Sequence, residues 1–252
     1  MRIAHERHGR GPALVLLHPL GADRRMWSPV IPHLAAEREV VAVDLPGFGG
    51  SPALDGPGPP TPRVLAQAVA RGLEDVIAGP FHVAGNSLGG WVALEIALAG
   101  HARSVTAIGT AGLWPEPLMP RRSAARRLAR LAAPLLPLIT RTARGRRLAL
   151  GATIARPERV PAGEALHLAR SYARSPGFDA VNDAMRAGRF TGLADIRVPV
   201  TLAWPEHDRL VKPPRALPPG VRSVFLRGCG HLPTWDDPEQ VAAVLLAGSH
   251  EG

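Results

Sequence analysis

The chain has 252 residues, of which 46% are hydrophobic and 20% charged, and Cys229 is its single cysteine. This length suffices for one large core, and the apolar content excludes collagen-like and disordered chains. A single cysteine excludes an intrachain disulfide framework, while the formal net charge of +9 raises the question of an anionic partner.

The positive charge is not accompanied by the features of a nucleic-acid-binding or membrane protein. Lys212 is the only lysine among the 30 basic residues, and arginine, alanine, glycine and proline abound together, which is typical of GC-rich codon usage. The sequence shows no nucleic-acid reading motif, and no apolar run approaches the roughly 18 residues that span a bilayer. From Met1 onward it shows no hydrophobic signal segment. We therefore expect a cytoplasmic protein that binds neither nucleic acid nor a membrane, and the sequence leaves open whether it forms a homo-oligomer.

Short apolar runs recur along the chain at the spacing of an α/β fold. The predicted strands are residues 13–18, 39–44, 81–86, 104–110, 198–204 and 223–226, with an edge strand at residues 3–7. Helical patterns separate most of them, at residues 25–36, 63–77, 90–99 and 238–246. Because strands that alternate with helices form parallel sheets, the pattern predicts an α/β fold with a mostly parallel central sheet flanked by helices.

Residues 113–191 interrupt this alternation, since no strand signal occurs among them. About 80 residues are too many for a structureless loop in a compact domain, and recurrent prolines divide the segment into helical pieces. We therefore predict an α/β core formed by residues 1–112 and 192–252, with residues 113–191 as a helical cap insertion.

The predicted cap insertion is strongly basic, with ten arginines and no acidic residue at residues 121–156. Spacing of four residues places three of these arginines on one helix face, and three leucines mark another face. The arginine face, which we expect to be solvated, consists of Arg122, Arg126 and Arg130. The expected apolar underside consists of Leu128, Leu131 and Leu135.

The sequence Gly85-Asn86-Ser87-Leu88-Gly89-Gly90 follows a predicted strand and precedes a predicted helix. This is the G-x-S-x-G pattern of a nucleophile elbow, in which a sharp strand-to-helix turn exposes the central hydroxyl. The glycines provide the space that the turn needs. Ser87 takes the strained apex at a helix N-terminus, whose dipole favours developing negative charge. The pattern therefore predicts Ser87 as a nucleophile.

Four motifs occur in a characteristic order: LLHPLG at residues 16–21, DLPGFGGS at 44–51, GNSLGG at 85–90 and GCGHLPTWDDP at 228–238. With them the chain resembles the α/β-hydrolase fold superfamily, and among its serine-nucleophile branches it most resembles small carboxylesterases and enol-lactonase-like enzymes. The resemblance covers nearly the whole core. It places the cap at the insertion 113–191 and implies a hydrolase without a cofactor.

A serine nucleophile needs a base and an acid that orients the base, and the family order is Ser, then acid, then His. His231 lies in a glycine-rich turn after the last predicted strand, so we predict that it is the base. Asp208 follows the strand at residues 198–204 and keeps the register of the family's Gly-x-x-Asp turn, although Pro205 replaces the glycine. We therefore favour Asp208 over Glu206 as the acid.

The resemblance also implies an oxyanion hole of two backbone N–H groups. One belongs to Leu88, directly after the nucleophile, and the other to Leu20, in the loop after the first core strand. Pro19 stands where the family has glycine. A proline has no N–H, so Pro19 cannot donate, and its effect on the loop geometry stays open.

The remaining motif residues have structural or lining roles in this interpretation. Residues 44–51 brace the elbow, and Cys229 is a small buried hydrophobe. Leu232 and Trp235, which follow the predicted base closely, are candidates for lining the substrate pocket. The sequence shows neither a metal-ligand cluster nor a nucleotide-binding fingerprint, so we expect no metal and no cofactor.

We therefore predict a serine hydrolase that cleaves a small hydrophobic carboxylic ester or lactone through an acyl-enzyme. The alternatives are a carbon–carbon bond hydrolase of vinylogous diketones, a cofactor-free perhydrolase-like enzyme, and a ligand-binding protein on the same fold. The oxyanion motif has fewer glycines than is usual for the carbon–carbon hydrolases. A binding protein is disfavoured because Ser87, Asp208 and His231 are all present.

Overall fold

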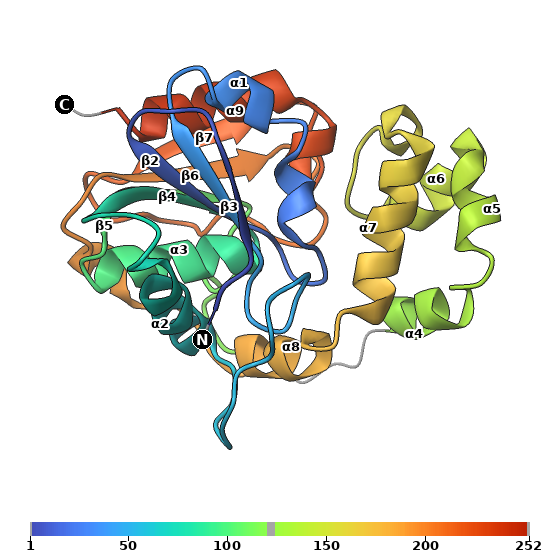
Figure 1. Cartoon of the computed structure of the whole chain (residues 1–252), viewed down its shortest axis with the longest axis horizontal. Coiled ribbons are helices and arrows are strands. Elements are labelled where there is room, and N and C mark those ends of the chain that lie inside the picture. Colours follow the sequence, from blue (N-terminus) through green and yellow to red (C-terminus); the bar gives the residue numbers. More distant parts are fainter. Residues whose placement is uncertain (1, 120–123, 251–252) are drawn as a thin grey trace.

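The computed structural model describes residues 2–119 and 124–250. In this part of the chain, seven strands form one sheet in the order β1-β3-β2-β4-β5-β6-β7 (Figure 1). β1 pairs antiparallel with β3, and the other neighbours pair parallel. The strands are β1 His5–His8, β2 Ala13–Leu17, β3 Glu39–Val43, β4 Phe81–Asn86, β5 Ala102–Ile108, β6 Val200–Pro205 and β7 Arg222–Leu226. The predicted α/β fold with a mostly parallel sheet is confirmed.

Helices cover both faces of the sheet, with α2 and α3 packed together on one face and α1 and α9 on the other (Figure 1). Their bounds are α1 Ile31–Leu34, α2 Pro62–Leu73, α3 Leu88–Leu98 and α9 Pro238–Gly248. The buried core divides accordingly, because successive strand residues point to opposite faces. Along β2, Val15 and Leu17 join the cluster that includes α2 and α3. Leu14 and Leu16 join the cluster that includes α1 and α9.

The helix predicted over residues 25–36 is wrong. This segment forms a short 3-10 turn, η1 (Arg24–Trp27), and a single helical turn, α1 (Ile31–Leu34). Pro29 lies between them and has no N–H to donate, and a proline ring in a helix interior clashes with the carbonyl of the preceding turn. The prolines therefore outweigh the apolar periodicity on which the prediction was based.

Between β5 and β6, within the predicted cap insertion, the described residues form five helices. They are α4 Ala124–Leu131, α5 Leu136–Arg141, α6 Ala143–Leu150, α7 Ala162–Arg174 and α8 Phe178–Arg186. The described residues also form the 3-10 turns η2 Pro157–Arg159, η3 Gly192–Asp195 and η4 Pro233–Trp235. Figure 1 shows α4 to α7 gathered at one side of the sheet, while α8 lies against α2. Among the described residues, the helices are all too short or too polar to cross a bilayer.

The segment around helix α4 differs from the prediction at Arg126 and at three leucines, whereas Arg130 is exposed as predicted. Arg126 is buried, with 1% of its surface exposed, and Arg122 lies outside the described residues. The three leucines expected underneath are instead exposed: Leu128 at 68%, Leu131 at 71% and Leu135 at 58%. The predicted solvated face is therefore wrong at Arg126, and the predicted apolar underside is wrong at these leucines.

The reason lies in the surface against which α4 packs, which is the C-terminal end of α7. Arg126 donates from Nε to Tyr172 O (3.0 Å) and from Nη2 to Ser175 O (2.6 Å). Arg130 donates from Nε to Ala173 O (3.1 Å). The last carbonyls of a helix lack intrahelical donors, so this surface favours guanidinium groups over leucine side chains.

Candidate active site

Ser87 occupies the turn between β4, which ends at Asn86, and α3, which begins at Leu88. Its backbone has φ 55° and ψ −114°, and it is the only non-glycine residue of the described chain with a positive φ. Such a conformation costs about 1–3 kcal/mol and persists only where the surroundings enforce it. Here Ser87 N donates to Ile108 O (2.9 Å), and Ser87 O accepts from Ala111 N (3.1 Å). The strained turn is thus held by the end of β5.

The glycines around Ser87 allow this turn to pack against its neighbours. A Cβ atom at Gly85 would collide with the backbone of Gly89, and one at Gly89 would collide with the carbonyl of Leu17. A Cβ atom at Gly90 would lie 2.8 Å from Thr110 Oγ1. The glycine pattern in the sequence therefore reflects close backbone approaches at the start of α3.

His231 and Asp208 form a buried pair, with 2.7 Å between His231 Nδ1 and Asp208 Oδ2. The other carboxylate oxygen, Oδ1, accepts from the backbone amides of Leu210 (2.7 Å) and Val211 (3.0 Å). These two amides fix the orientation of the carboxylate. Since a carboxylate accepts from Nδ1–H, the neutral imidazole then carries its acceptor lone pair on Nε2, which is the arrangement a general base needs.

Backbone and side-chain contacts bring this pair to the carboxyl ends of β4 and β5. Asn86 donates from Nδ2 to Ile108 O (3.0 Å) and to His231 O (3.1 Å). A Cβ atom at Gly109 would lie 2.9 Å from Asp208 Oδ2 and 3.6 Å from His231 Nδ1. The three predicted triad residues therefore follow the ends of β4, β6 and β7 and are gathered at one edge of the sheet, where ligands of parallel sheets bind.

Glu206, the other carboxylate considered for the acid, has a different partner. Its Oε2 accepts from Gly228 N (2.8 Å), which braces the loop that leads to His231. The proline that replaces the family's glycine is accommodated in a turn, because Pro205 O accepts from Asp208 N (3.1 Å). Of the two carboxylates, the structure pairs Asp208 with the imidazole.

The loop after β2 is organised by His18, which is fully buried. Leu45 N donates to His18 Nε2 (2.9 Å), so the ring proton lies on Nδ1, which donates to Pro19 O (2.8 Å). Burial lowers the pKa of His18 despite the hydrogen bond to Pro19, and the ring is therefore neutral. Pro19 O also accepts from Ala22 N (3.2 Å). Because a trans peptide directs its C=O and N–H to opposite sides, these donors fix the direction of the Leu20 N–H.

The second predicted oxyanion donor is the amide of Leu88. Leu88 is the first residue of α3, and the first four N–H groups of a helix have no intrahelical acceptor. The positive end of the helix dipole adds to the attraction for an anion at this position. Leu88 is thus placed where a negative charge that develops beside Ser87 would be stabilised.

The predicted lining residues belong to the apolar cluster on the α9 side of the sheet. Leu232 is buried and Trp235 is half-buried, and both pack in this cluster with the buried Cys229. Both residues follow His231 closely in the sequence, and their contact with a substrate stays a prediction.

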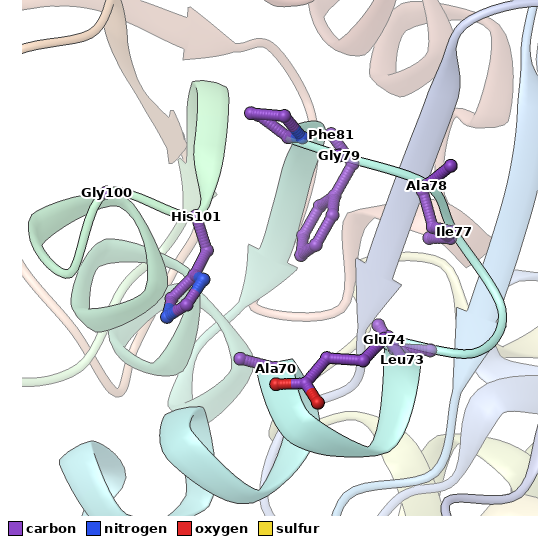
Figure 2. A pocket seen from close by; sticks show the side chains of 10 residues that line it. Ala70, Leu73, Glu74, Ile77, Ala78, Gly79, Phe81, Gly100 and His101 are labelled. Atoms are coloured by element: carbon purple, nitrogen blue, oxygen red, sulfur yellow. The ribbon is translucent and has the colours of Figure 1, made fainter.

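A hollow of about 310 Å³ opens at the opposite edge of the sheet, at the amino end of β4 (Figure 2). Glu74 and His101 extend into it between apolar side chains such as Leu73, Ile77 and Phe81. Its lining contains neither a serine nor a cysteine, so it offers no nucleophile of the predicted kind. In the described part of the chain, His, Cys, Asp and Glu form no group of three or more suited to a metal ion.

Sequence reasoning missed two buried polar residues that organise this site. Asn86 was interpreted only as a variable position of the elbow, although an amide side chain ending an apolar strand needs a hydrogen-bonding partner. Asp236, next to the helix-capping Asp237, was not singled out, and it accepts from the amide of Gly230 (2.8 Å). Each side chain also has a distant partner, His231 for Asn86 and Ala155 for Asp236, so the sequence could signal these roles only through an unexplained buried polar residue.

The alpha/beta hydrolase family matches this chain over residues 14–244. The chain belongs to this family. The pimeloyl-[acyl-carrier protein] methyl ester esterase of Legionella pneumophila (strain Paris) is 36% identical over 103 residues, which are 41% of this chain and 39% of that relative. The chain therefore matches well under half the length of this esterase.

A longer match is found with the epoxide hydrolase EphH of Mycobacterium tuberculosis, which is 31% identical over 198 residues, or 73% of this chain and 92% of the relative. Among solved structures, a membrane phospholipase A described as a bacterial virulence factor superposes with a TM-score of 0.76 at 27% identity. That match covers 99% of this chain and 84% of the phospholipase. The chain is thus a hydrolase of the α/β type, as the motifs predicted.

Proposed function

We propose that this hydrolase cleaves a carboxylic ester or lactone through an acyl-enzyme formed on Ser87. His231 removes the Ser87 proton as the hydroxyl oxygen attacks the acyl carbonyl. Asp208 holds the imidazole tautomer and stabilises the imidazolium that forms. The alcohol leaves with the proton from His231. Water, deprotonated by the same imidazole, then releases the acid and frees Ser87.

One observation carries this proposal. The buried His231–Asp208 pair, with Nδ1 and Oδ2 2.7 Å apart, lies at the sheet edge where Ser87 is held in a strained turn. A structural ion pair would account for the buried pair but not for a serine with positive φ at the same edge. Strain of this kind is characteristic of functional sites.

The proposed oxyanion donors complete the chemistry. The tetrahedral intermediate places a negative charge on the former carbonyl oxygen, and the amides of Leu20 and Leu88 would share it. The helix N-terminus at Leu88 and the fixed Pro19–Leu20 peptide support these roles. Each such donor lowers the barrier by about 2.7–4 kcal/mol in comparable enzymes.

We further propose that residues 113–191 form a cap on a core of residues 1–112 and 192–252. Support comes from the contacts between the two parts. Gly177 N donates to Gly47 O (3.0 Å), and a Cβ atom at Gly21 would lie 3.0 Å from both Tyr172 and Phe178. Gly21 follows the proposed donor Leu20, so aromatic side chains of the cap border the oxyanion loop. This apolar border favours a hydrophobic substrate.

Ring opening of an epoxide is the second candidate, because the relative with the longer match is named an epoxide hydrolase. The two candidates differ in the nucleophile and in the leaving group. A serine hydroxyl at the elbow and a cradle for an oxyanion fit acyl transfer, in which a carbonyl carbon is attacked. We therefore place ester or lactone cleavage first.

The test is labelling with a fluorophosphonate probe followed by a substrate panel. We expect one phosphonyl adduct on Ser87, located by peptide mass spectrometry, and its absence in Ser87→Ala. The panel contains p-nitrophenyl esters, lactones, vinylogous diketones, peroxide with an acid, and an epoxide. Turnover of esters or lactones supports the proposal. Failure of labelling, or turnover of the epoxide alone, would overturn it.

A further inference from the structure

Asp236 lies between η4 and α9, and its carboxylate is buried among backbone amides. Oδ2 accepts from Gly230 N (2.8 Å) and from Ala155 N (3.0 Å), while Oδ1 accepts from Arg156 N (2.8 Å). Gly230 directly precedes the proposed base. Ala155 and Arg156 belong to the proposed cap. One carboxylate therefore joins the residue before His231 to two residues that lie 81 and 80 positions before Asp236 in the chain.

Further contacts hold these two segments directly against each other. Leu232 N donates to Thr153 O (2.8 Å), on the other side of His231. A Cβ atom at Gly230 would lie 2.7 Å from Thr153 O and 2.8 Å from Ala155 N. The residues before and after His231 are thus both fixed to residues 153–156, and the close approach requires the glycine.

Capping of α9 does not explain the Asp236 side chain. The N-cap of α9 is Asp237, whose Oδ1 accepts from Gln240 N (2.9 Å). Asp236 has all of its described side-chain hydrogen bonds with Gly230, Ala155 and Arg156. The two adjacent carboxylates therefore have different roles. Asp237 caps α9, whereas Asp236 connects the loop that contains His231 to the proposed cap.

We propose that Asp236 is a positioning residue, which holds His231 in line with Ser87 and couples that alignment to the docking of residues 153–156. The inference rests on the proposed function, because it takes His231 as the base. An imidazole displaced by about 1 Å from its productive position lowers the rate by up to about a hundredfold. The carboxylate prevents that displacement by fixing the backbone at Gly230.

The variant Asp236→Asn tests this role, and Asp237→Asn is its matched control. An asparagine has one acceptor oxygen, and its NH2 group cannot accept from a backbone amide. At least one of the two segments therefore loses its hydrogen bond to residue 236. We expect kcat to fall by about ten- to a hundredfold with KM changed less than about twofold. Asparagine remains a good N-cap, so Asp237→Asn should keep kcat within about twofold. Equal kcat in Asp236→Asn and the wild-type protein would overturn the inference.

The rate of fluorophosphonate labelling separates this inference from the proposed function. If wild-type Ser87 is not labelled, the proposed function fails, and the inference fails with it. If the wild-type protein is labelled, we expect Asp236→Asn to be labelled at least about tenfold more slowly, since the probe needs an aligned base. Equal labelling rates would overturn the inference alone.

Hydrogen exchange of the wild-type protein covers the case in which Asp236→Asn does not fold. Amides that share one acceptor group open together, so we expect Gly230, Ala155 and Arg156 to exchange with one common opening free energy. An opening equilibrium that differs by more than about a hundredfold between Gly230 and the two cap amides would contradict the coupling.

Discussion

Asn86 and His231 are 145 residues apart in the chain, and Asn86 Nδ2 donates to His231 O at 3.1 Å. The same amide donates to Ile108 O at 3.0 Å, so the side chain of Asn86 connects the turn before Ser87 to both β5 and the loop that contains His231. The turn at Ser87 and the backbone of His231 are therefore held by a shared group. A displacement of either one strains a buried hydrogen bond.

Ser87→Ala should abolish ester hydrolysis while the protein remains folded. The hydroxyl is the only group removed, and the backbone bonds to Ile108 and Ala111 remain. We expect kcat/KM to fall by at least about a thousandfold, with the melting temperature within a few degrees of wild type. Steady-state kinetics and thermal unfolding measure the two effects. Activity within tenfold of wild type would remove Ser87 as the nucleophile.

Asp208→Asn and Glu206→Gln should differ sharply in activity. Asp208 accepts from His231, whereas Glu206 accepts from Gly228. An asparagine at position 208 favours the wrong imidazole tautomer, which costs about 10⁴-fold in kcat. Glu206→Gln keeps an acceptor for its amide partner and should stay within about threefold of wild type. The reverse ranking in steady-state kinetics would assign the acid to Glu206.

The strands and the elbow could be predicted because their signals are local. β4 was predicted at its exact bounds, because a mostly apolar run ends at a turn whose close backbone approaches require glycine. The helix predicted at residues 25–36 failed because prolines override apolar periodicity. The prediction of a solvated Arg126 failed for a different reason. Helical spacing shows which residues share a face, but it does not show whether the neighbouring surface consists of carbonyl groups or of apolar side chains.

The site was predictable where a motif fixes both the residue and its register. Asp208 and His231 are examples, because each follows a strand end at a defined distance, and the structure brings them together. Asn86 and Asp236 were not predicted as organising residues. Their partners lie 145 and up to 81 residues away, and no local pattern in the sequence encodes such pairs.

The pairing of Asp23 with His167 should make the stability of the fold sensitive to acid. Burial alone would raise the pKa of Asp23, but the hydrogen bond and charge of His167, with Nε2 2.6 Å from Asp23 Oδ2, outweigh it. The pKa of Asp23 is thereby lowered from 3.8 to about 2. A carboxylate with a lowered pKa stabilises the folded state above its unfolded pKa, and this contribution is lost as the pH falls toward 2.

We therefore expect Asp23→Asn to be less stable than the wild-type protein by about 1–2 kcal/mol near neutral pH. The difference should shrink between about pH 4 and pH 2. Urea unfolding at several pH values measures it, and the exposed Asp55→Asn is a control for loss of a carboxylate. A difference that stays constant down to pH 2 would show that the charge of Asp23 does not stabilise the fold.

Cys229 should be unreactive in the folded protein. Burial raises the pKa of its thiol to about 12, and the nearby carboxylates of Asp236 and Asp237 contribute. The thiolate is the reactive form, so at pH 8 only a minute fraction of the folded protein can react. We expect no labelling by a disulfide reagent within an hour at pH 8 and one label per chain in denaturant. Labelling of the native protein within minutes would show that the loop at Gly230 opens readily.

The guanidinium of Arg126 connects α4 to the start of α8. Besides its carbonyl acceptors at the end of α7, it donates to Asp179 Oδ2 (2.6 Å) and lies 4.3 Å from the centre of the Phe178 ring. Arg126→Ala should destabilise the protein by about 2–3 kcal/mol, because buried carbonyls lose their donors and the stem leaves a cavity.

The neighbouring Arg127 is exposed, which makes Arg127→Ala the matched control. Both variants remove one positive charge from the same helix, so a general effect of net charge would appear in both. We expect Arg127→Ala to change the free energy of unfolding by less than about 0.5 kcal/mol in denaturant titrations. Equal stability of the two variants would mean that the guanidinium of Arg126 contributes only its charge. A selective loss in Arg126→Ala would show that the basic helix α4 is anchored by an arginine rather than by its leucines.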